Sequence, residues 1–316
     1  MEIMQATLMD DYEVCVDCLS SRPVEPVPSD CCGQGCSPCV LDIYDEELKL
    51  WKKNCWKRHG GGSDEVQGEP VDMMKPDEYT ICKLITKDQV TTNTFLFTFA
   101  LPEGYSLDLA LGQHLVLRQE APTGGIITRQ YTPISPTGRR NKFTVLIKLY
   151  EDGKMSRCIR DWQVGTHCDW RGPIGSFSYH VNQYSHIYLI AAGTGITPLY
   201  GIISHIVEND NEETFVRLLY ASRSYNDILL RKKLNELALY WNFSVRYFLS
   251  QNSGERQTNS YGEEIHVGRI SKTDLAKEIA VTESSQAIVC GTRHFEADMK
   301  GYLLELGIQE DRIVRF

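Results

Sequence analysis

The stretch Arg129-Gln130-Tyr131-Thr132-Pro133-Ile134-Ser135 decides the fold, because it ends a strand with an arginine and a tyrosine on one face. Residues 126–131 are rich in β-branched and aromatic side chains, as strands are. Alternate residues of a strand point to the same side, so Arg129 and Tyr131 lie together. The arginine can bind a phosphate through paired hydrogen bonds, and the tyrosine ring can stack on a flat cofactor ring. Taken alone, the run is better explained as a solvated arginine beside a cross-strand aromatic residue.

A second phosphate-binding pattern follows at Gly153-Lys154-Met155-Ser156, before a short helix predicted over 156–161. Backbone N–H groups at a helix start, with the Ser156 hydroxyl, would cradle a phosphate. The alternative is an ordinary helix in which Ser156 is the N-cap. Lys148 and Tyr150 share a face of the preceding strand, which either lines a cofactor or is the wet side of the sheet.

The third pattern is Gly193-Thr194-Gly195-Ile196-Thr197-Pro198, which joins a buried strand to a helix. Pro198 opens the helix at a position where its missing N–H costs nothing. Glycines at a helix N-terminus suit a pyrophosphate, although an ordinary tight turn would look the same. Cys290-Gly291 ends a later strand, at the edge where parallel sheets bind ligands. Cys290 is therefore either a site residue or a small buried side chain.

The order of elements predicts an antiparallel β-barrel in residues 76–180 and an α/β parallel-sheet domain in residues 181–316. The second domain alternates strands with helices, which favours a parallel sheet with helices on both faces. The elements that we expect are listed by residue range: strands at 79–86, 94–100, 113–119, 126–131 and 143–150, then strands at 186–191, 215–222, 244–250, 286–290 and 312–316 between helices at 198–208, 226–240, 271–281 and 294–306.

Residues 1–75 form a separate acidic segment, with 15 acidic and 7 basic side chains. The chain carries a net charge of −9, so the remaining residues are close to neutral and the sequence shows no basic patch for nucleic acid. One helix is expected over 42–57, followed by a glycine-rich linker. No apolar run is long enough to span a membrane, and the N-terminus lacks the pattern of a secretory signal. We therefore expect an intracellular, cytoplasmic monomer, with mitochondrial association left open.

Seven of the eleven cysteines lie before residue 56. An odd count without a secretory signal argues against a disulfide framework. Two Cys-x-x-Cys pairs, Cys15 with Cys18 and Cys36 with Cys39, have a spacing within the range of zinc ribbons. The alternative is a set of reduced thiols on a segment that binds a partner.

Taken together, these motifs resemble the NADH–cytochrome b5 reductase family of the ferredoxin–NADP reductase superfamily, over residues 78–316. The matching patterns fall in the family's order, and the following stretches carry them: Arg129 to Ser135, Ile147-Lys148-Leu149-Tyr150, Gly153 to Ser156, Gly172-Pro173-Ile174-Gly175, Gly193 to Pro198 and Asp227-Ile228-Leu229-Leu230-Arg231. Residues 31–48 separately resemble a short oxidoreductase-like domain.

The resemblance implies an FAD-binding barrel, an NADH-binding domain and electron transfer to a haem protein, most directly cytochrome b5. It implies that Arg129 and Ser156 bind pyrophosphate, and that Thr197 and Cys290 flank the site of hydride transfer. The residues implied to bind cofactor are Arg129, Gln130, Tyr131, Thr132, Ser135, Lys148, Tyr150, Gly153, Lys154, Met155, Ser156, Gly193, Thr194, Gly195, Thr197, Pro198 and Gly291. A diaphorase with another acceptor, and a non-catalytic nucleotide-binding module that recruits a partner, remain alternatives.

Two departures from the family concern the nicotinamide nucleotide. The family pattern Cys-Gly-Pro-Pro-x-Met becomes Cys290-Gly291-Thr292-Arg293-His294-Phe295, so both stiffening prolines are missing and Met299 is displaced. The acidic residue that selects NADH falls at Ser250, which removes repulsion against the 2′-phosphate of NADPH. We therefore expect a weakened preference for NADH, with Arg246 or Arg256 as the candidate phosphate partner.

Overall fold

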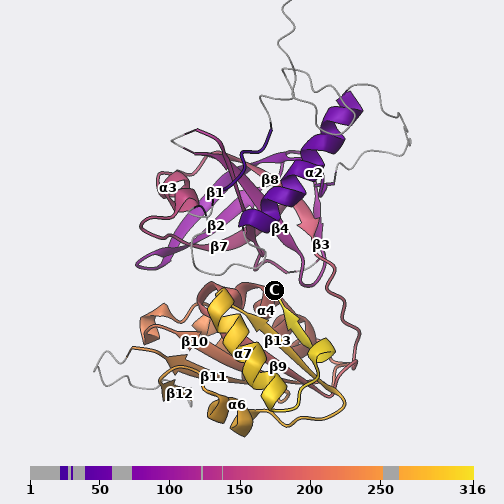
Figure 1. Ribbon diagram of the computed structural model, residues 1–316, viewed down its shortest axis with the longest axis vertical. Helices are drawn as coiled ribbons and strands as arrows, with labels where there is room; N and C mark the ends of the chain where they lie inside the picture. The colour runs from indigo at the N-terminus through magenta and orange to yellow at the C-terminus, as the bar shows by residue number, and fades with distance from the viewer. Residues whose placement is uncertain are drawn as a thin grey trace, which may run out of the picture.

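The structure is a computed structural model that describes residues 22–27, 30, 40–58, 73–121, 124–136, 138–251 and 263–316. Its core is two six-stranded sheets, each with its own set of helices, which follow one another along the chain (Figure 1). This arrangement confirms the expected antiparallel barrel followed by a parallel-sheet domain.

The first sheet is antiparallel and has the strand order β5-β4-β8-β1-β2-β7. A bridge between Pro133, just after β5, and Val145 of β7 brings its edges together as a barrel. A separate pair, β3 with β6, and a short helix, α3, complete this part. The bounds are β1 Thr80–Thr91, β2 Thr94–Ala100, β3 Leu107–Leu109, β4 His114–Glu120, β5 Ile126–Tyr131, β6 Gly138–Arg140, β7 Lys142–Lys148, α3 Lys154–Arg160 and β8 His167–Ile174.

Aromatic side chains fill the barrel. Phe97 and Phe99 are two apart on β2, so the period of a strand turns both inward, where they are fully buried. Phe143 stacks on Phe99 with ring centroids 5.4 Å apart, and Trp170 lies edge-on to both rings at 5.1 Å. Burial of each such ring stabilises the fold by roughly 1.5–3 kcal/mol, so the sheet is held closed from inside.

The second sheet is entirely parallel and has the order β12-β11-β10-β9-β13-β14. Helices α4 and α5 pack on one face, and α6 and α7 on the other, where Figure 1 shows α7 in front of the sheet. The chain leaves β9 toward β10 on one side and later returns to its other side with β13. The bounds are β9 His186–Ala192, α4 Ile196–Val207, β10 Phe215–Ser222, α5 Arg231–Leu237, β11 Phe243–Leu249, β12 Glu264–Val267, α6 Lys272–Glu278, β13 Ser285–Cys290, α7 Arg293–Glu305 and β14 Ile313–Arg315.

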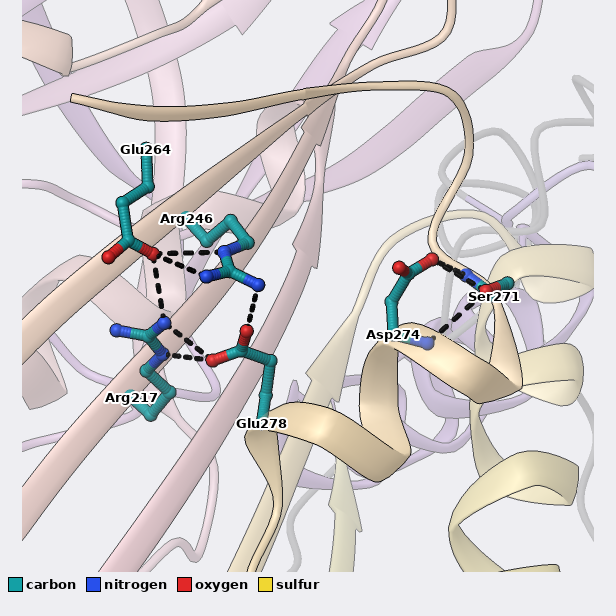
Figure 2. A network of polar contacts seen from close by, with 6 residues as sticks. All are labelled: Arg217, Arg246, Glu264, Ser271, Asp274 and Glu278. Carbon is teal, nitrogen blue, oxygen red and sulfur yellow. Dashed lines mark hydrogen bonds and ion pairs between the residues drawn. The ribbon is translucent and has the colours of Figure 1, made fainter.

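A network of four charged residues ties α6 to this sheet (Figure 2). Arg217 of β10 donates to Glu278 at 2.8 Å and to Glu264 at 3.1 Å. Arg246 of β11 donates to the same Glu264 oxygen at 2.9 Å and also pairs with Glu278. Burial alone would raise the pKa of Glu264, but the hydrogen bond from Arg246 and the charges of both arginines hold it below its usual value. Charge is therefore balanced within this face of the domain.

Helix α6 begins with a capping box, as Figure 2 also shows. The backbone N–H of Asp274 donates to the Ser271 hydroxyl, and the backbone N–H of Ser271 donates to the Asp274 carboxylate at 3.0 Å. These two bonds satisfy two N–H groups that a helix start leaves without partners.

Helix α2 (Val40–Arg58) confirms the helix expected over 42–57 and lies across the barrel against β5 (Figure 1). Ile43, Glu47 and Trp51 repeat at helical spacing and are 2%, 7% and 9% exposed, so one face of the helix is buried. The Glu47 carboxylate accepts hydrogen bonds from Arg171 of β8 at 2.9 and 3.1 Å, and from the Tyr79 hydroxyl at 2.6 Å. The helix is therefore anchored to the barrel by a buried ion pair.

Several expected elements differ in extent. Strands β3, β6, β8 and β12 were not expected. The helix expected over 226–240 is a 3₁₀ turn, Tyr225–Asp227, followed by the shorter α5. Leu230 separates the two with φ +55°, a left-handed conformation that a continuous helix excludes. Helix α3 begins at Lys154, so Ser156 is its third residue and the N-cap interpretation of Ser156 is wrong. Within the described ranges, no helix has the length and hydropathy needed to cross a membrane.

Candidate functional site

A cavity of about 840 Å³ lies between the barrel and the parallel-sheet domain and takes its walls from both. It collects nearly all the residues that the sequence motifs singled out, although these lie up to 160 positions apart. The expected residues that line it are Arg129, Gln130, Tyr131, Thr132, Lys148, Tyr150, Gly153, Lys154, Met155, Ser156, Thr194, Gly195, Thr197, Pro198, Cys290 and Gly291.

Two expected site residues do not line the cavity and have structural contacts instead. The Ser135 hydroxyl accepts a hydrogen bond from the backbone N–H of Thr144 at 2.7 Å. Gly193 adopts φ +55°, and its carbonyl accepts a hydrogen bond from Tyr220 at 2.9 Å. Both residues shape the turns on which their neighbours reach the cavity.

On the barrel side, β5 contributes the arginine and the tyrosine that opened the sequence argument. Arg129 and Tyr131 both line the cavity, as their alternation along the strand requires. Tyr131 is held edge-on against the buried Trp170, with ring centroids 5.9 Å apart. One Arg129 nitrogen donates to the carbonyl of Thr128 at 2.7 Å. These contacts fix the tyrosine ring and leave the other guanidinium N–H groups of Arg129 for an anion.

The turn at Gly153 is too tight for a side chain. A Cβ on Gly153 would stand 2.8 Å from the Ser156 hydroxyl oxygen. That hydroxyl is 5% exposed and accepts a hydrogen bond from the backbone N–H of Tyr150 at 2.9 Å. Since a hydroxyl also has one proton to donate, Ser156 can still donate to an oxygen in the cavity. The turn is therefore built to bring backbone and hydroxyl donors close to an anion.

On the opposite wall, the turns after β9 and β13 meet. A Cβ on Gly195 would lie 2.2 Å from the carbonyl oxygen of Cys290, so only glycine allows this approach. The Thr197 hydroxyl donates to the carbonyl of Thr194 at 3.0 Å, which fixes its oxygen at the start of α4. These two strands flank the point where the strand order reverses, which is where open parallel sheets bind their ligands.

The turn after Cys290 is held by side chains where the family pattern has two prolines. The Thr292 hydroxyl caps α7 by accepting from the backbone N–H of Phe295 at 3.3 Å. The Glu296 carboxylate, 1% exposed, accepts from the backbone N–H of Gly291 at 3.0 Å. Burial raises the pKa of Glu296 to about 7, against the opposing effect of the Gly291 hydrogen bond. The displaced Met299 is buried in the core under α7 and lies outside the cavity.

The Cys290 thiol stays protonated near neutral pH. Burial raises its pKa well above the usual range, and the nearby Glu296 carboxylate adds to that rise. The thiol contacts the carbonyl of Phe316 at 3.6 Å, so it is a neutral, weakly polar part of the wall. A thiol in this state is a poor nucleophile.

Among the further lining residues that the motifs did not include are His114, Phe177 and Phe316. The two phenylalanine rings meet with centroids 5.3 Å apart, one from each domain. Nε2 of His114 is buried and finds no hydrogen-bond partner within the described residues. Burial lowers the pKa of His114 to about 4, and the charge of Arg171 contributes, so the imidazole is neutral. Phe316 could have been found by sequence, because it follows a predicted parallel strand whose carboxyl end faces the site.

The acidic residue that would select NADH is replaced by an exposed serine. Ser250 follows β11, and its backbone N–H donates to the carbonyl of Ser222 at the end of β10. Arg246 is bound by Glu264 and Glu278, which argues against its role as a phosphate partner, and Arg256 lies outside the described residues. Arg223 is exposed. It lies beside Ser250, since the backbone N–H of the next residue, Gln251, donates to the Arg223 carbonyl at 2.8 Å.

The candidate metal ligands Cys15, Cys18, Cys36 and Cys39 also lie outside the described residues. Within the part of the chain that the structure describes, no group of three or more histidine, cysteine or acidic side chains is placed to hold a metal ion.

Comparison with known proteins places this geometry in a family. Residues 81–179 match the oxidoreductase FAD-binding domain, residues 189–301 the oxidoreductase NAD-binding domain, and residues 15–59 the N-terminal domain of oxidoreductase-like proteins. A human protein, NADH-cytochrome b5 reductase-like, is 40% identical over 305 residues, which cover 93% of this chain and 94% of that protein. The chain belongs to the NADH-cytochrome b5 reductase family. It therefore has an FAD-binding and an NAD-binding domain, as the motifs predicted.

Other members of the NADH-cytochrome b5 reductase family and a solved structure agree. NADH-cytochrome b5 reductase 1 of Dictyostelium discoideum is 35% identical over 260 residues, which cover 81% of this chain and 88% of that protein. The cytochrome b5 reductase domain of Ulva prolifera nitrate reductase superposes with a TM-score of 0.68 at 25% identity, over 77% of this chain and 98% of that domain. The orphaned His114 nitrogen and the side-chain-free turn at Gly153 are features that a bound flavin nucleotide would fill.

Proposed function

We propose that this protein is an FAD-dependent NADH oxidoreductase that passes single electrons to a haem protein, most directly cytochrome b5. The observation that carries the proposal is the shared cavity, in which the phosphate-binding turn and β5 face Thr197 and Cys290 of the other domain. FAD, when bound, accepts a hydride and releases electrons one at a time. Cytochrome b5 is the acceptor for which the related NADH-cytochrome b5 reductases are named, and this supports it as the acceptor here.

The residues of this chain would bind FAD and orient it in the cavity. Arg129, Lys154 and Ser156 would hold the pyrophosphate of FAD, and Tyr131 would pack against its ring system. Gly195 rests on the carbonyl of Cys290, so the turns that carry Thr197 and Cys290 lie together in one wall of the cavity. The neutral thiol of Cys290 excludes water from the site without adding charge.

Electron transfer to cytochrome b5 would use the exposed edge of the barrel near α3. Arg157 is exposed there, and Lys154 pairs with Asp30. Complementary charge of this kind raises the rate of encounter with an acidic partner more than its affinity. The expectations of a monomer and of a cytoplasmic location stay predictions.

The structure gives no support to the alternative of a non-catalytic nucleotide-binding module. That alternative rested on the altered turn after Cys290, and this turn is held by Thr292 and Glu296. A diaphorase with another acceptor would use the same proposed chemistry, and the assay below distinguishes it from a cytochrome b5 reductase.

The test is spectroscopic. We expect purified protein to carry a yellow flavin that NADH bleaches without oxygen, and to reduce added cytochrome b5 at a rate proportional to enzyme. Ser156→Ala should weaken FAD binding about tenfold, whereas Ser135→Ala, which loses an equivalent bond to backbone N–H outside the cavity, should not. A colourless protein that cannot take up FAD would refute the proposal, and bleaching without cytochrome b5 reduction would refute the acceptor.

A further inference from the structure

The segment that precedes the barrel lies against the phosphate end of the cavity. We call residues 22–27, Asp30 and helix α2 the N-terminal strap. We propose that the N-terminal strap forms the subsite for the adenosine half of FAD, an inference that rests on the proposed function. The flavin half would then be held by the two catalytic domains, and the adenosine half by an element that precedes them.

The strap is firmly anchored where it meets the barrel. Glu47 and Arg171 form an ion pair with side chains 9% and 5% exposed, and Arg22 lies over the Trp51 ring at 5.7 Å. Asp30 pairs with Lys154 in the phosphate-binding turn itself. Residues 22–27 are thus tied to α2, and Asp30 to the cofactor turn.

A second cavity, of about 110 Å³, lies between the strap and the turn that joins β4 to β5. Asp30, Val40, Arg129 and Lys154 line both this cavity and the large one. Arg129 and Lys154, which would hold the pyrophosphate, are two of these four residues, so the second cavity adjoins the phosphate end. It lies away from Thr197 and Cys290, which line only the large cavity.

This placement indicates which part of FAD would bind in the second cavity. A dinucleotide whose pyrophosphate lies at Arg129 and Lys154, and whose flavin ring reaches toward Thr197, must place its other nucleoside beyond the phosphates. The space on that side of Lys154 is the second cavity. The second cavity, at about 110 Å³, is smaller than a cavity of about 150 Å³ that holds a benzene ring, so it would receive only part of the base, and the rest of the adenosine would lie outside it.

The walls of the second cavity suit a flat, weakly polar base. The strap supplies Pro23, Val24, Pro26 and Tyr44, and the β4–β5 turn faces them with Gly125. The surfaces are close, because a Cβ on Gly125 would lie 3.3 Å from the Val24 side chain. Rigid apolar walls with one aromatic ring are typical of sites that hold a planar ligand ring.

The experiment compares FAD with FMN, which has the same flavin and one phosphate but no adenosine. Flavin is removed from the full-length protein, and each flavin is titrated back by fluorescence quenching. We expect Tyr44→Ala to raise the Kd of FAD about tenfold and to leave the Kd of FMN within twofold. Leu41→Ala, on the exposed face of α2, is the matched control and should change neither.

A second variant guards against loss of folding. Val24→Asp changes a residue that is 60% exposed, so the fold does not depend on it, and it places a carboxylate beside the base. Val24→Asp should also weaken the binding of FAD more than the binding of FMN. The inference is overturned if wild-type protein binds FAD and Tyr44→Ala and Val24→Asp bind it as tightly as Leu41→Ala does. It is also overturned if the two variants weaken the binding of FAD and of FMN equally. In both cases the proposed function stands. If wild-type protein binds no FAD, both are overturned.

Discussion

The buried ion pair between Glu47 and Arg171 leads to a sharp prediction about stability. Glu47→Ala removes a carboxylate oxygen that accepts from the Tyr79 hydroxyl and from two nitrogens of Arg171. The guanidinium stays buried, since its side chain is 5% exposed. It keeps a hydrogen bond to the Pro76 carbonyl at 2.7 Å and one to Tyr79 at 3.3 Å.

The expected cost follows from these contacts. Removal of one partner of a buried ion pair costs about 3–5 kcal/mol, because it leaves an uncompensated charge. Since Arg171 retains two hydrogen bonds, we expect the lower end, about 3 kcal/mol. For a protein of this size, that corresponds to a fall in Tm of about 6–12 °C.

The assay is thermal unfolding of the FAD-loaded protein, followed by circular dichroism. Glu46→Ala is the matched control, because it makes the same change one residue away, on the exposed side of α2. It should change the free energy of unfolding by no more than about 0.5 kcal/mol. Glu47→Gln should fall between the two, because the amide still accepts hydrogen bonds but carries no charge. Equal melting temperatures for Glu47→Ala and Glu46→Ala would show that the ion pair does not hold α2 to the barrel.

Three further predictions concern the NAD-binding domain. Ser250→Asp should raise the ratio of kcat/KM for NADH over NADPH about tenfold or more, by repelling the 2′-phosphate, and an unchanged ratio would contradict this assignment. Burial raises the pKa of Glu296 in the folded state to about 7, from an ordinary value near 4.5. The stability that its protonated form contributes is therefore complete below pH 4.5 and is lost as pH rises through 7. Glu296→Gln should abolish this loss of stability, which amounts to up to about 3 kcal/mol, in thermal melts from pH 5 to 8. If stability fell with pH equally in the wild type and in Glu296→Gln, the titration of Glu296 would not be its cause. Gly195→Ala should push its Cβ into the Cys290 carbonyl and slow flavin bleaching by NADH, whereas Gly201→Ala, with open space around it, should not; similar rates would argue against close contact at the site.

Most of the candidate site residues line one cavity, and the sequence could single them out because their patterns are local. Arg129 with Tyr131, and Gly153 with Ser156, are patterns of a few residues whose geometry follows from a strand or a turn. The parallel-sheet order then brings Thr197 and Cys290 together, because the carboxyl ends of parallel strands meet at one edge. Such inferences need no knowledge of distant contacts.

What the sequence could not predict depends on partners far along the chain. Glu47 reads as one acidic residue in an acidic segment, and only the fold brings it to Arg171, 124 positions later. The N-cap interpretation of Ser156 failed because helix α3 starts two residues earlier. Strand β8 was missed although Cys168 and Trp170 alternate with Asp169 and Arg171, because the glycine and proline that follow suggested a turn.

The contact between Gly195 and the Cys290 carbonyl also bears on how this sequence can change in evolution. These positions belong to two motifs 95 residues apart, yet neither turn can shift without the other. Gly291 is constrained as well, because a Cβ there would lie 2.6 Å from the Phe295 ring. Beyond Gly291 the chain leaves this contact, and there the prolines of the family pattern have been replaced. Thr292 and Arg293, which stand where the family pattern has its two prolines, therefore lie just outside the point where the two turns touch.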